Sequence, residues 1–161
     1  MTLKSWHFIN IFLAALVTGV FWGPWLGLSR SIESFSPEVF LAIGQRMIGN
    51  LAPVMPILMP AALLSTVPVL LLSYRKRSTT FHWTLAGFGL LIVALLITLL
   101  VEVPIDDQIK TWTLQSLPAD WQAARDRWEK FHVMRTFSSV AGLALLIAGA
   151  LFDSPPRQRD G

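Results

Sequence analysis

The chain has 161 residues, the length of a single domain, and it is 53% hydrophobic but only 14% charged. Soluble domains carry about 25% charged residues, so this composition excludes a soluble globular surface. The formal net charge of +3 arises from basic residues in short clusters beside apolar runs, an arrangement that excludes nucleic acid as a partner and is typical of proteins whose partner is a lipid bilayer. Without cysteine, the chain has no thiolate nucleophile and no iron–sulfur ligand.

Four long uncharged runs are candidates for membrane-spanning helices. The runs lie between pairs of charged residues: Lys4 and Arg30, Arg46 and Arg75, Arg77 and Glu102, Arg135 and Asp153. A helix needs about 20 apolar residues to cross the hydrocarbon core, a length that the first three runs exceed. The fourth run is shorter, so its helix is expected to begin near Trp128. Since no segment alternates polar and apolar residues, we predict an all-α, integral membrane four-helix bundle over residues 1–153.

The first run has the basic start and apolar core of a signal peptide. However, Phe21, Trp22 and Trp25 are typical of a membrane interface, and no small-x-small cleavage site stands out. We therefore expect this segment to be retained as a helix.

The basic residues predict the orientation of the bundle. Arg75-Lys76-Arg77 fills the short second loop, Lys4 precedes the first span, and Arg157 and Arg159 lie in the tail. With an even number of spans these segments share one side, and the positive-inside rule places that side in the cytoplasm. We expect a multi-pass protein of the cell membrane with both termini cytoplasmic and residues 154–161 forming a disordered tail.

The second span is rich in proline. It contains Pro53, Pro56, Pro60 and Pro68, each of which removes one backbone donor and displaces a carbonyl group. The predicted helix is therefore kinked, and the kinks could serve either to fit neighbouring helices or to open a cavity between the spans.

The third loop predicts an amphipathic, extramembrane helical segment that leads into the fourth span. Asp120 is a candidate helix N-cap, and from it a helix can run without a break into the apolar run. Residues at spacings of three and four then lie on one face of this helix: Trp121, Arg125, Trp128, His132 and Arg135. A stripe of Trp, Arg and His side chains thus enters the membrane from the outer side.

Two acidic residues stand at the outer end of the third span. Glu102 and Asp106 are four residues apart, with Pro104 between them expected to bend the chain. Since consecutive spans pack antiparallel, these acids should lie near the fourth span, where an acid and a cation at membrane depth should pair. We predict a contact between Glu102 and Arg135, with His132 beside it.

Simpler interpretations exist for several of these residues. Charged residues at helix ends often only fix the depth of the helix, and Trp121 is read as an interfacial belt residue. Arg46 and Asn50 are four residues apart at the predicted outer start of the second span, and they could join the cluster or merely anchor the helix. His7 and His82 could face each other across a haem, but solvated histidines are also common near membrane interfaces. No spacing of His and carboxylate residues indicates a metal site.

Together, these residues resemble the anthrone oxygenase-like family of four-span membrane proteins, whose members are mostly of unknown function. The resemblance extends over almost the whole chain and rests on a run at the end of the third span and a stripe entering the fourth: Val103-Pro104-Ile105-Asp106-Asp107, Asp120-Trp121, Arg125, Trp128, His132 and Arg135. The typical pattern has Asn where this chain has Asp106.

The resemblance implies oxidation of an anthrone to an anthraquinone by molecular oxygen without a cofactor. His132 would be the base, since imidazole ionises near neutral pH, Arg135 would stabilise the enolate, and Trp128 would stack on a flat substrate. Together with Trp128, the candidate substrate-binding residues from the clusters described above are Glu102, Asp106, Arg125, Arg46 and Asn50. The alternative is a non-catalytic membrane protein that binds a hydrophobic or aromatic small molecule. A transporter subunit is less favoured because no acidic residue lies in mid-span.

Overall fold

The computed structural model describes residues 2–75 and 78–152. The predicted tail at residues 154–161 and part of the basic second loop lie outside this range. Most of the described residues are helical, and none of them forms a strand. The elements are α1 (Leu3–Gly27), the 3₁₀ helix η1 (Ser29–Ser34), α2 (Pro37–Leu51), α3 (Met55–Arg75), α4 (Thr80–Ile97), the π-helical turn η2 (Thr98–Glu102), α5 (Val103–Thr111) and α6 (Trp121–Leu151).

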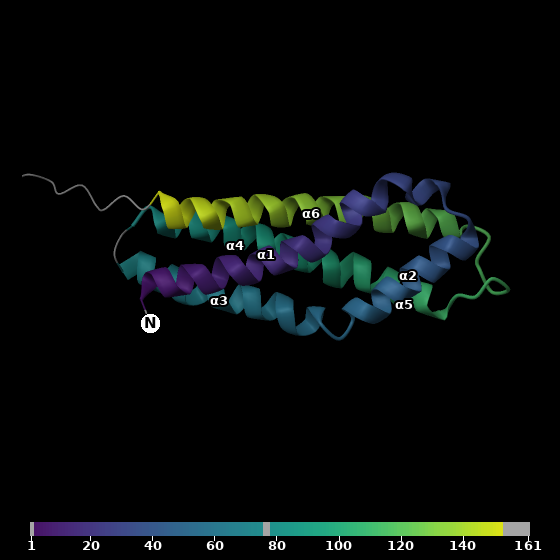
Figure 1. Cartoon of the computed structure of the whole chain (residues 1–161), viewed down its shortest axis with the longest axis horizontal. Helices are drawn as coiled ribbons and strands as arrows, with labels where there is room; N and C mark the ends of the chain where they lie inside the picture. The colour runs from purple at the N-terminus through teal and green to yellow at the C-terminus, as the bar shows by residue number, and fades with distance from the viewer. Residues whose placement is uncertain (1, 76–77, 153–161) are drawn as a thin grey trace, which may run out of the picture.

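Four helical segments are long and apolar enough to cross a membrane: Leu3–Ser34, Met55–Arg75, Thr80–Thr111 and Trp121–Leu151. They run side by side, and the start of α1 and the end of α6 lie at the same end of the molecule (Figure 1). Large apolar side chains such as Phe8, Ile57 and Leu64 are exposed on the outside, where lipid would cover them. The predicted all-α, membrane-spanning four-helix bundle is confirmed.

Small residues allow α4 and α6 to approach closely. A Cβ atom added at Gly87 would lie 2.8 Å from the carbonyl oxygen of Gly142, and one added at Gly142 would lie 3.1 Å from that of Gly87. Close backbone contact of this kind is a common way for helices to associate in lipid, where packing replaces the hydrophobic effect. The α4–α6 pair is thus a tightly packed part of the bundle.

The predicted start of the second span is wrong. The chain forms a separate helix, α2, that ends at Leu51, and the span itself begins only at Met55. Proline has no N–H group, so Pro53 and Pro56 each remove a bond from the helical ladder, and residues 52–54 form a turn instead. As a result, Arg46 lies on α2 outside the spans and not at the start of one.

The third span does not end at Pro104. Its helix passes through a π-helical turn, in which the N–H of Val103 donates to the carbonyl of Thr98, and continues as α5 to Thr111. A π turn accommodates a local irregularity in the ladder, and Pro104 stands in the first turn of α5, where a missing N–H costs little. Pro104 is therefore carried within a continuous helical segment.

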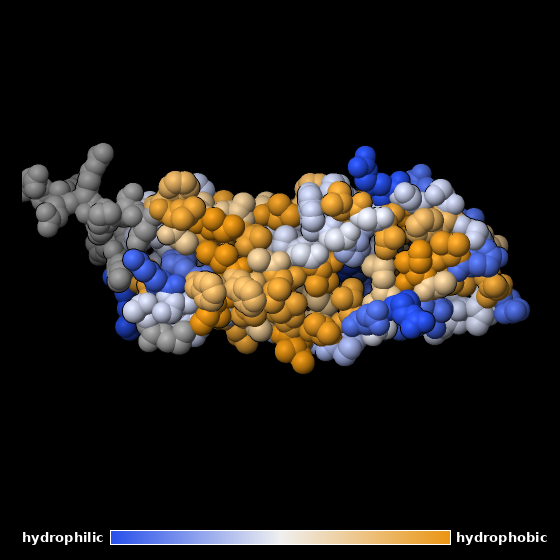
Figure 2. All heavy atoms as spheres, viewed as in Figure 1, coloured by the Kyte–Doolittle hydropathy of each residue, from blue (hydrophilic) through white to orange (hydrophobic). Residues whose placement is uncertain are grey.

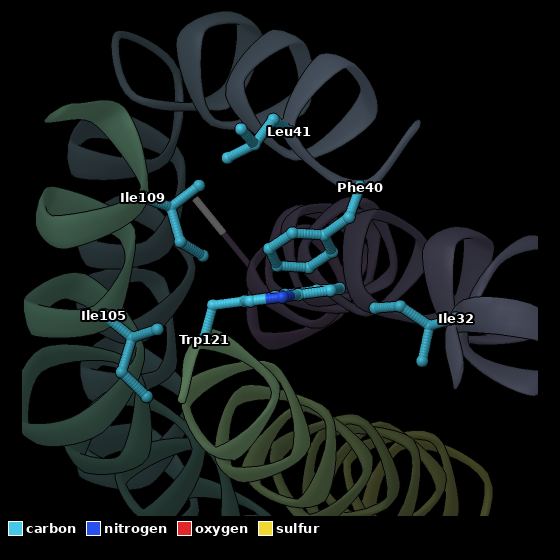
Figure 3. Packing of buried hydrophobic residues seen from close by; sticks show 6 residues of the cluster. All are labelled: Ile32, Phe40, Leu41, Ile105, Ile109 and Trp121. Carbon is cyan, nitrogen blue, oxygen red and sulfur yellow. The ribbon is translucent and has the colours of Figure 1, made fainter. Parts of the chain in front are cut away.

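A second layer of structure extends the bundle at the end distant from the N-terminus. Helix α6 has 31 residues, or about 46 Å at 1.5 Å per residue, so its first turns project beyond a hydrocarbon core about 30 Å thick. These turns pack with η1, α2 and α5 around one apolar cluster (Figure 3): Ile32, Phe40, Leu41, Ile105, Ile109 and Trp121. The aromatic rings of Phe40 and Trp121 lie 5.2 Å apart within it. The extramembrane layer thus has a small core of its own.

Candidate functional site

A cavity of about 590 Å³ lies where the membrane-spanning bundle meets the extramembrane layer. Residues of α1, α2, α3, η2, α5 and α6 contribute to its walls, which are mainly apolar. Three prolines are among them, Pro24 of α1 and Pro56 and Pro60 of α3, so the proline-rich segments border an open space. In Figure 2 this region appears as a hollow beside the hydrophobic band, with hydrophilic atoms recessed in it. The volume falls within the range of about 300–1,000 Å³ typical of small-molecule sites.

A buried ion pair lies at the polar end of this cavity. Oε2 of Glu102 is 2.9 Å from Nη2 of Arg135, and the two side chains come from the third and fourth spans. Glu102 is 0% exposed and Arg135 is 9% exposed. The contact does not have hydrogen-bond geometry, and neither carboxylate oxygen accepts a hydrogen bond from another described residue. The predicted contact is confirmed, and it joins two oppositely charged groups that would be costly to bury alone.

His132 is held by the same guanidinium group. Nε and Nη2 of Arg135 lie 3.3 and 3.0 Å from Nδ1 of His132. Because a guanidinium group can only donate, Nδ1 must be the acceptor, and Nε2 carries the proton of the neutral ring. The ring lies near the carbonyl of Phe21, but no hydrogen bond of acceptable geometry joins Nε2 to any described residue. At 1% exposure, His132 is almost completely enclosed.

Arg135 has two further partners on other helices. Its Nη1 donates to Oγ1 of Thr98 at 3.3 Å, and its guanidinium carbon lies 4.6 Å from the centre of the Phe21 ring. The cation is therefore fixed by a carboxylate, an imidazole, a hydroxyl group and an aromatic face. A charge so well held can stabilise a developing negative charge without moving.

Trp128 joins the histidine to an acidic residue on the cavity wall. Its ring is stacked on the His132 ring, with centroids 4.9 Å apart and an interplanar angle of 3°. Its Nε1 donates to Oδ1 of Asp106 at 3.1 Å. Asp106, Trp128, His132 and Arg135 all border the cavity, whereas Glu102 lies behind it. Four of the predicted site residues thus meet at one end of one cavity.

The model of the anthrone oxygenase family matches residues 50–145, which is more than half of the chain. The chain belongs to the anthrone oxygenase family. The matched segment includes Glu102, Asp106, Trp128, His132 and Arg135, so the polar end of the cavity lies within it, while α1 and most of α2 lie outside. No curated protein and no protein of known structure matches the chain.

In this anthrone oxygenase family member, Arg125 and Trp121 stabilise the extramembrane layer instead of bordering the cavity. The Arg125 guanidinium pairs with Asp126, with Nη2 and Oδ1 2.7 Å apart, and its Nη1 donates to the carbonyl of Glu33. It also lies 5.3 Å from the Trp121 ring centre. Trp121 is buried in the apolar cluster and is not an interfacial belt residue. Both residues share the face of α6 that carries His132 and Arg135, but they lie nearer its N-terminus, where this face packs against the apolar cluster and not against the cavity.

Arg46 and Asn50 are not brought to the cluster. Both are exposed on α2, and neither borders the cavity. The reason is the turn at residues 52–54, which separates α2 from the span. His82 lies instead in a small depression of about 200 Å³ with Tyr74, Ser78 and Phe81. Within residues 2–75 and 78–152, no group of three His, Asp or Glu side chains is arranged to hold a metal ion.

Several residues of the cavity wall were missed by sequence reasoning. Met47 of α2 and Met55 and Met59 of α3 supply flexible apolar side chains to it, and Phe21 and Thr98 contact Arg135. Methionine adapts to ligands of different shape. The available signal was the gathering of three of the five methionines between residues 47 and 59.

Proposed function

We propose that this protein is a membrane-embedded oxygenase that oxidises a lipophilic, flat aromatic compound of the anthrone type with molecular oxygen. The observation that carries the proposal is the cavity itself, whose walls are apolar and whose one polar end holds Asp106, Trp128 and the fixed cation of Arg135. The family to which the chain belongs supports the same reaction.

The proposed reaction needs a proton acceptor, a positive charge and oxygen. An anthrone carries a CH₂ group beside two aromatic rings and opposite a carbonyl group. Removal of one proton breaks a C–H bond and leaves the electron pair delocalised onto the carbonyl oxygen as an enolate. The carbanion carbon then reduces O₂, forms a C–O bond and becomes a hydroperoxide, which loses water to give the second carbonyl group. One anthrone and one O₂ thus yield one anthraquinone and one water.

The polar end of the cavity suits this chemistry. A guanidinium group held in a water-poor site stabilises an enolate oxygen more strongly than it would in bulk water. Arg135 is held in this way by Glu102, His132 and Thr98. In this proposal the main work of His132 is to orient the guanidinium, and Trp128, which borders the cavity, stacks on a flat substrate.

The second candidate is a non-catalytic protein that binds a hydrophobic or aromatic small molecule. The methionine-rich wall favours it, because an adaptable apolar cavity binds flat ligands whether or not a reaction follows. The two candidates differ only in whether bound ligand is consumed.

Oxygen uptake by the protein in nanodiscs, supplied with a dithranol-type anthrone, tests the proposal. We expect oxygen uptake to be faster than spontaneous oxidation of the anthrone, and this excess rate is the activity of the protein. One O₂ should be consumed for each anthraquinone formed. Gly44 borders the cavity, so Gly44→Leu should fill it and abolish the excess rate, whereas Gly49→Leu, on the same helix with no atom near its added Cβ, should retain it. Binding of the anthrone without excess oxygen uptake would instead support the non-catalytic candidate.

A further inference from the structure

We infer that Asp106, and not His132, is the catalytic residue that takes the proton from the substrate. This inference rests on the proposed function, because it assigns the base within the same cavity. It replaces the role that the sequence suggested for His132, and it follows from where the free lone pairs of the site lie.

His132 has no free lone pair to offer. Its Nδ1 already accepts from Arg135 at 3.0 Å, and the other ring nitrogen must carry the hydrogen of the neutral ring. Nε2 is also buried away from solvent, and Trp128 covers one face of the ring. A base must come within hydrogen-bond reach of the proton that it removes. In this arrangement the imidazole is a positioning residue for the cation.

Asp106 meets the geometric requirement. Its carboxylate is half-buried on the cavity wall, in the first turn of α5. Trp128 donates to Oδ1 at 3.1 Å, which fixes the carboxylate, while no hydrogen bond to Oδ2 is present among the described residues. The lone pairs of Oδ2 are therefore available to a substrate proton.

The other acid of the cluster cannot take this role. Glu102 is fully buried, lies behind the cavity wall and is paired with Arg135.

Two cations, Arg135 and Lys110, interact electrostatically with Asp106. Lys110 also borders the cavity, but it is held by Asp107 at 2.9 Å and is more exposed than Arg135, so Arg135 is the more deeply buried cation of the site.

The proton transfer has a defined balance. A C–H bond of the substrate breaks, an O–H bond forms at Oδ2 of Asp106, and the electron pair stays on the substrate as an enolate beside Arg135. After oxygen has added, the same proton can return to the peroxide and leave in water. An asparagine at this position would keep the bond from Trp128 but could not accept the proton. The assignment of the base therefore applies to this chain, which has Asp106, and not to sequences that follow the typical pattern with Asn there.

Ultraviolet–visible spectroscopy under argon tests this step apart from oxygenation. A deprotonated anthrone is more extensively conjugated and absorbs at longer wavelength than the neutral form. With dithranol and nanodisc-embedded protein, the wild type and Asp107→Asn should both produce the anion band. Asp106→Asn should bind dithranol, as read by quenching of tryptophan fluorescence, yet lose at least about 90% of the band. Its rate of oxygen uptake should fall at least about 100-fold, the usual minimum contribution of general base catalysis.

Asp106→Ala with added formate provides a second variant, because a small carboxylate in the vacated space should restore part of the band. An anion band of wild-type size in Asp106→Asn, or its absence from the wild type, would overturn the inference. Oxygen uptake that persists in Asp106→Asn would overturn the inference but leave the proposed function standing. An anion band in the wild type without oxygen uptake in air would support Asp106 as the base but contradict the proposed oxygenase function.

Discussion

Glu102 and Arg135, which come from different spans, form an ion pair of 2.9 Å that is almost entirely buried. The pair ties the π-helical turn of the third span to α6 at the level where His132 and Trp128 meet the cavity. A buried pair of this kind adds little net stability relative to apolar residues, but it is costly to break. Its main effect is to hold one cation in one place.

Removal of either partner should therefore destabilise the protein. We expect Glu102→Gln or Arg135→Gln to cost about 3–5 kcal/mol, because each leaves an unpaired buried charge. The double variant Glu102→Arg with Arg135→Glu should be more stable than either single exchange, Glu102→Arg or Arg135→Glu, because only the double variant restores a pair of opposite charges. Thermal unfolding in detergent, followed by tryptophan fluorescence, measures both effects. The exposed pair Asp107–Lys110 is the control, since its loss should cost at most about 1 kcal/mol. A charge exchange no better folded than either single exchange would refute the pairing.

Close packing of α4 on α6 predicts a different response at two neighbouring glycines. Gly87→Ala should destabilise the bundle by about 1–3 kcal/mol, because the new Cβ would lie 2.8 Å from a main-chain oxygen that cannot move independently. Gly89→Ala, on the same helix with nothing within 4 Å, should be neutral or slightly stabilising. The melting temperatures of the two variants can be measured in the same detergent. Equal melting temperatures would argue against the close α4–α6 contact.

Gln45 fastens α2 to the end of α5. Its Nε2 donates to the carbonyls of Ile109 and Trp112 at 2.9 and 2.8 Å. Gln45→Ala removes the donor to the Trp112 carbonyl and leaves the Ile109 carbonyl with only the N–H of Trp112. The loss should cost about 1–3 kcal/mol and increase hydrogen exchange in α2. Gln108→Ala, at an exposed position of α5, should leave the exchange of α2 unchanged. Protection of α2 that survives Gln45→Ala would show that other contacts hold this helix.

We propose that the end carrying the N-terminus faces the cytoplasm, and the absence of cysteine makes this easy to test. Single cysteines can be placed at two exposed residues, Thr2 just before α1 and Gln115 in the loop between α5 and α6. The start of α1 and this loop lie at opposite ends of the molecule (Figure 1). In intact cells, a membrane-impermeant maleimide should label Gln115→Cys but should label Thr2→Cys only after permeabilisation. The reverse pattern would contradict the positive-inside prediction for this chain.

Much of the site could be predicted from the sequence because it depends on spacing. Trp128, His132 and Arg135 share a helix face at intervals of three and four, and Glu102 and Asp106 end the preceding antiparallel span. These two facts were sufficient to predict the contact between Glu102 and Arg135. The four spans followed in the same way, because length and lack of charge decide whether a segment can cross a bilayer.

The features that sequence reasoning missed depend on tertiary detail. Whether Pro53 only kinks a span or separates α2 from it depends on what α2 packs against, and Gln45 supplies that contact through α5. The hydrogen bond between Trp128 and Asp106 and the state of the His132 ring depend on which donor reaches which acceptor. Such choices depend on the positions of individual donor and acceptor atoms, which helical periodicity does not specify.

The position of a bound ligand tests the central claim most directly. An experimental structure of the protein in nanodiscs with a tricyclic aromatic analogue that lacks an oxidisable CH₂ group should show density in the cavity, between Asp106 and Trp128 on one side and Met59 on the other. The carbonyl oxygen of the analogue should point toward Arg135. Density only on the lipid-facing aromatic cluster of Trp22, Trp25 and Phe137, with the cavity empty, would contradict the account.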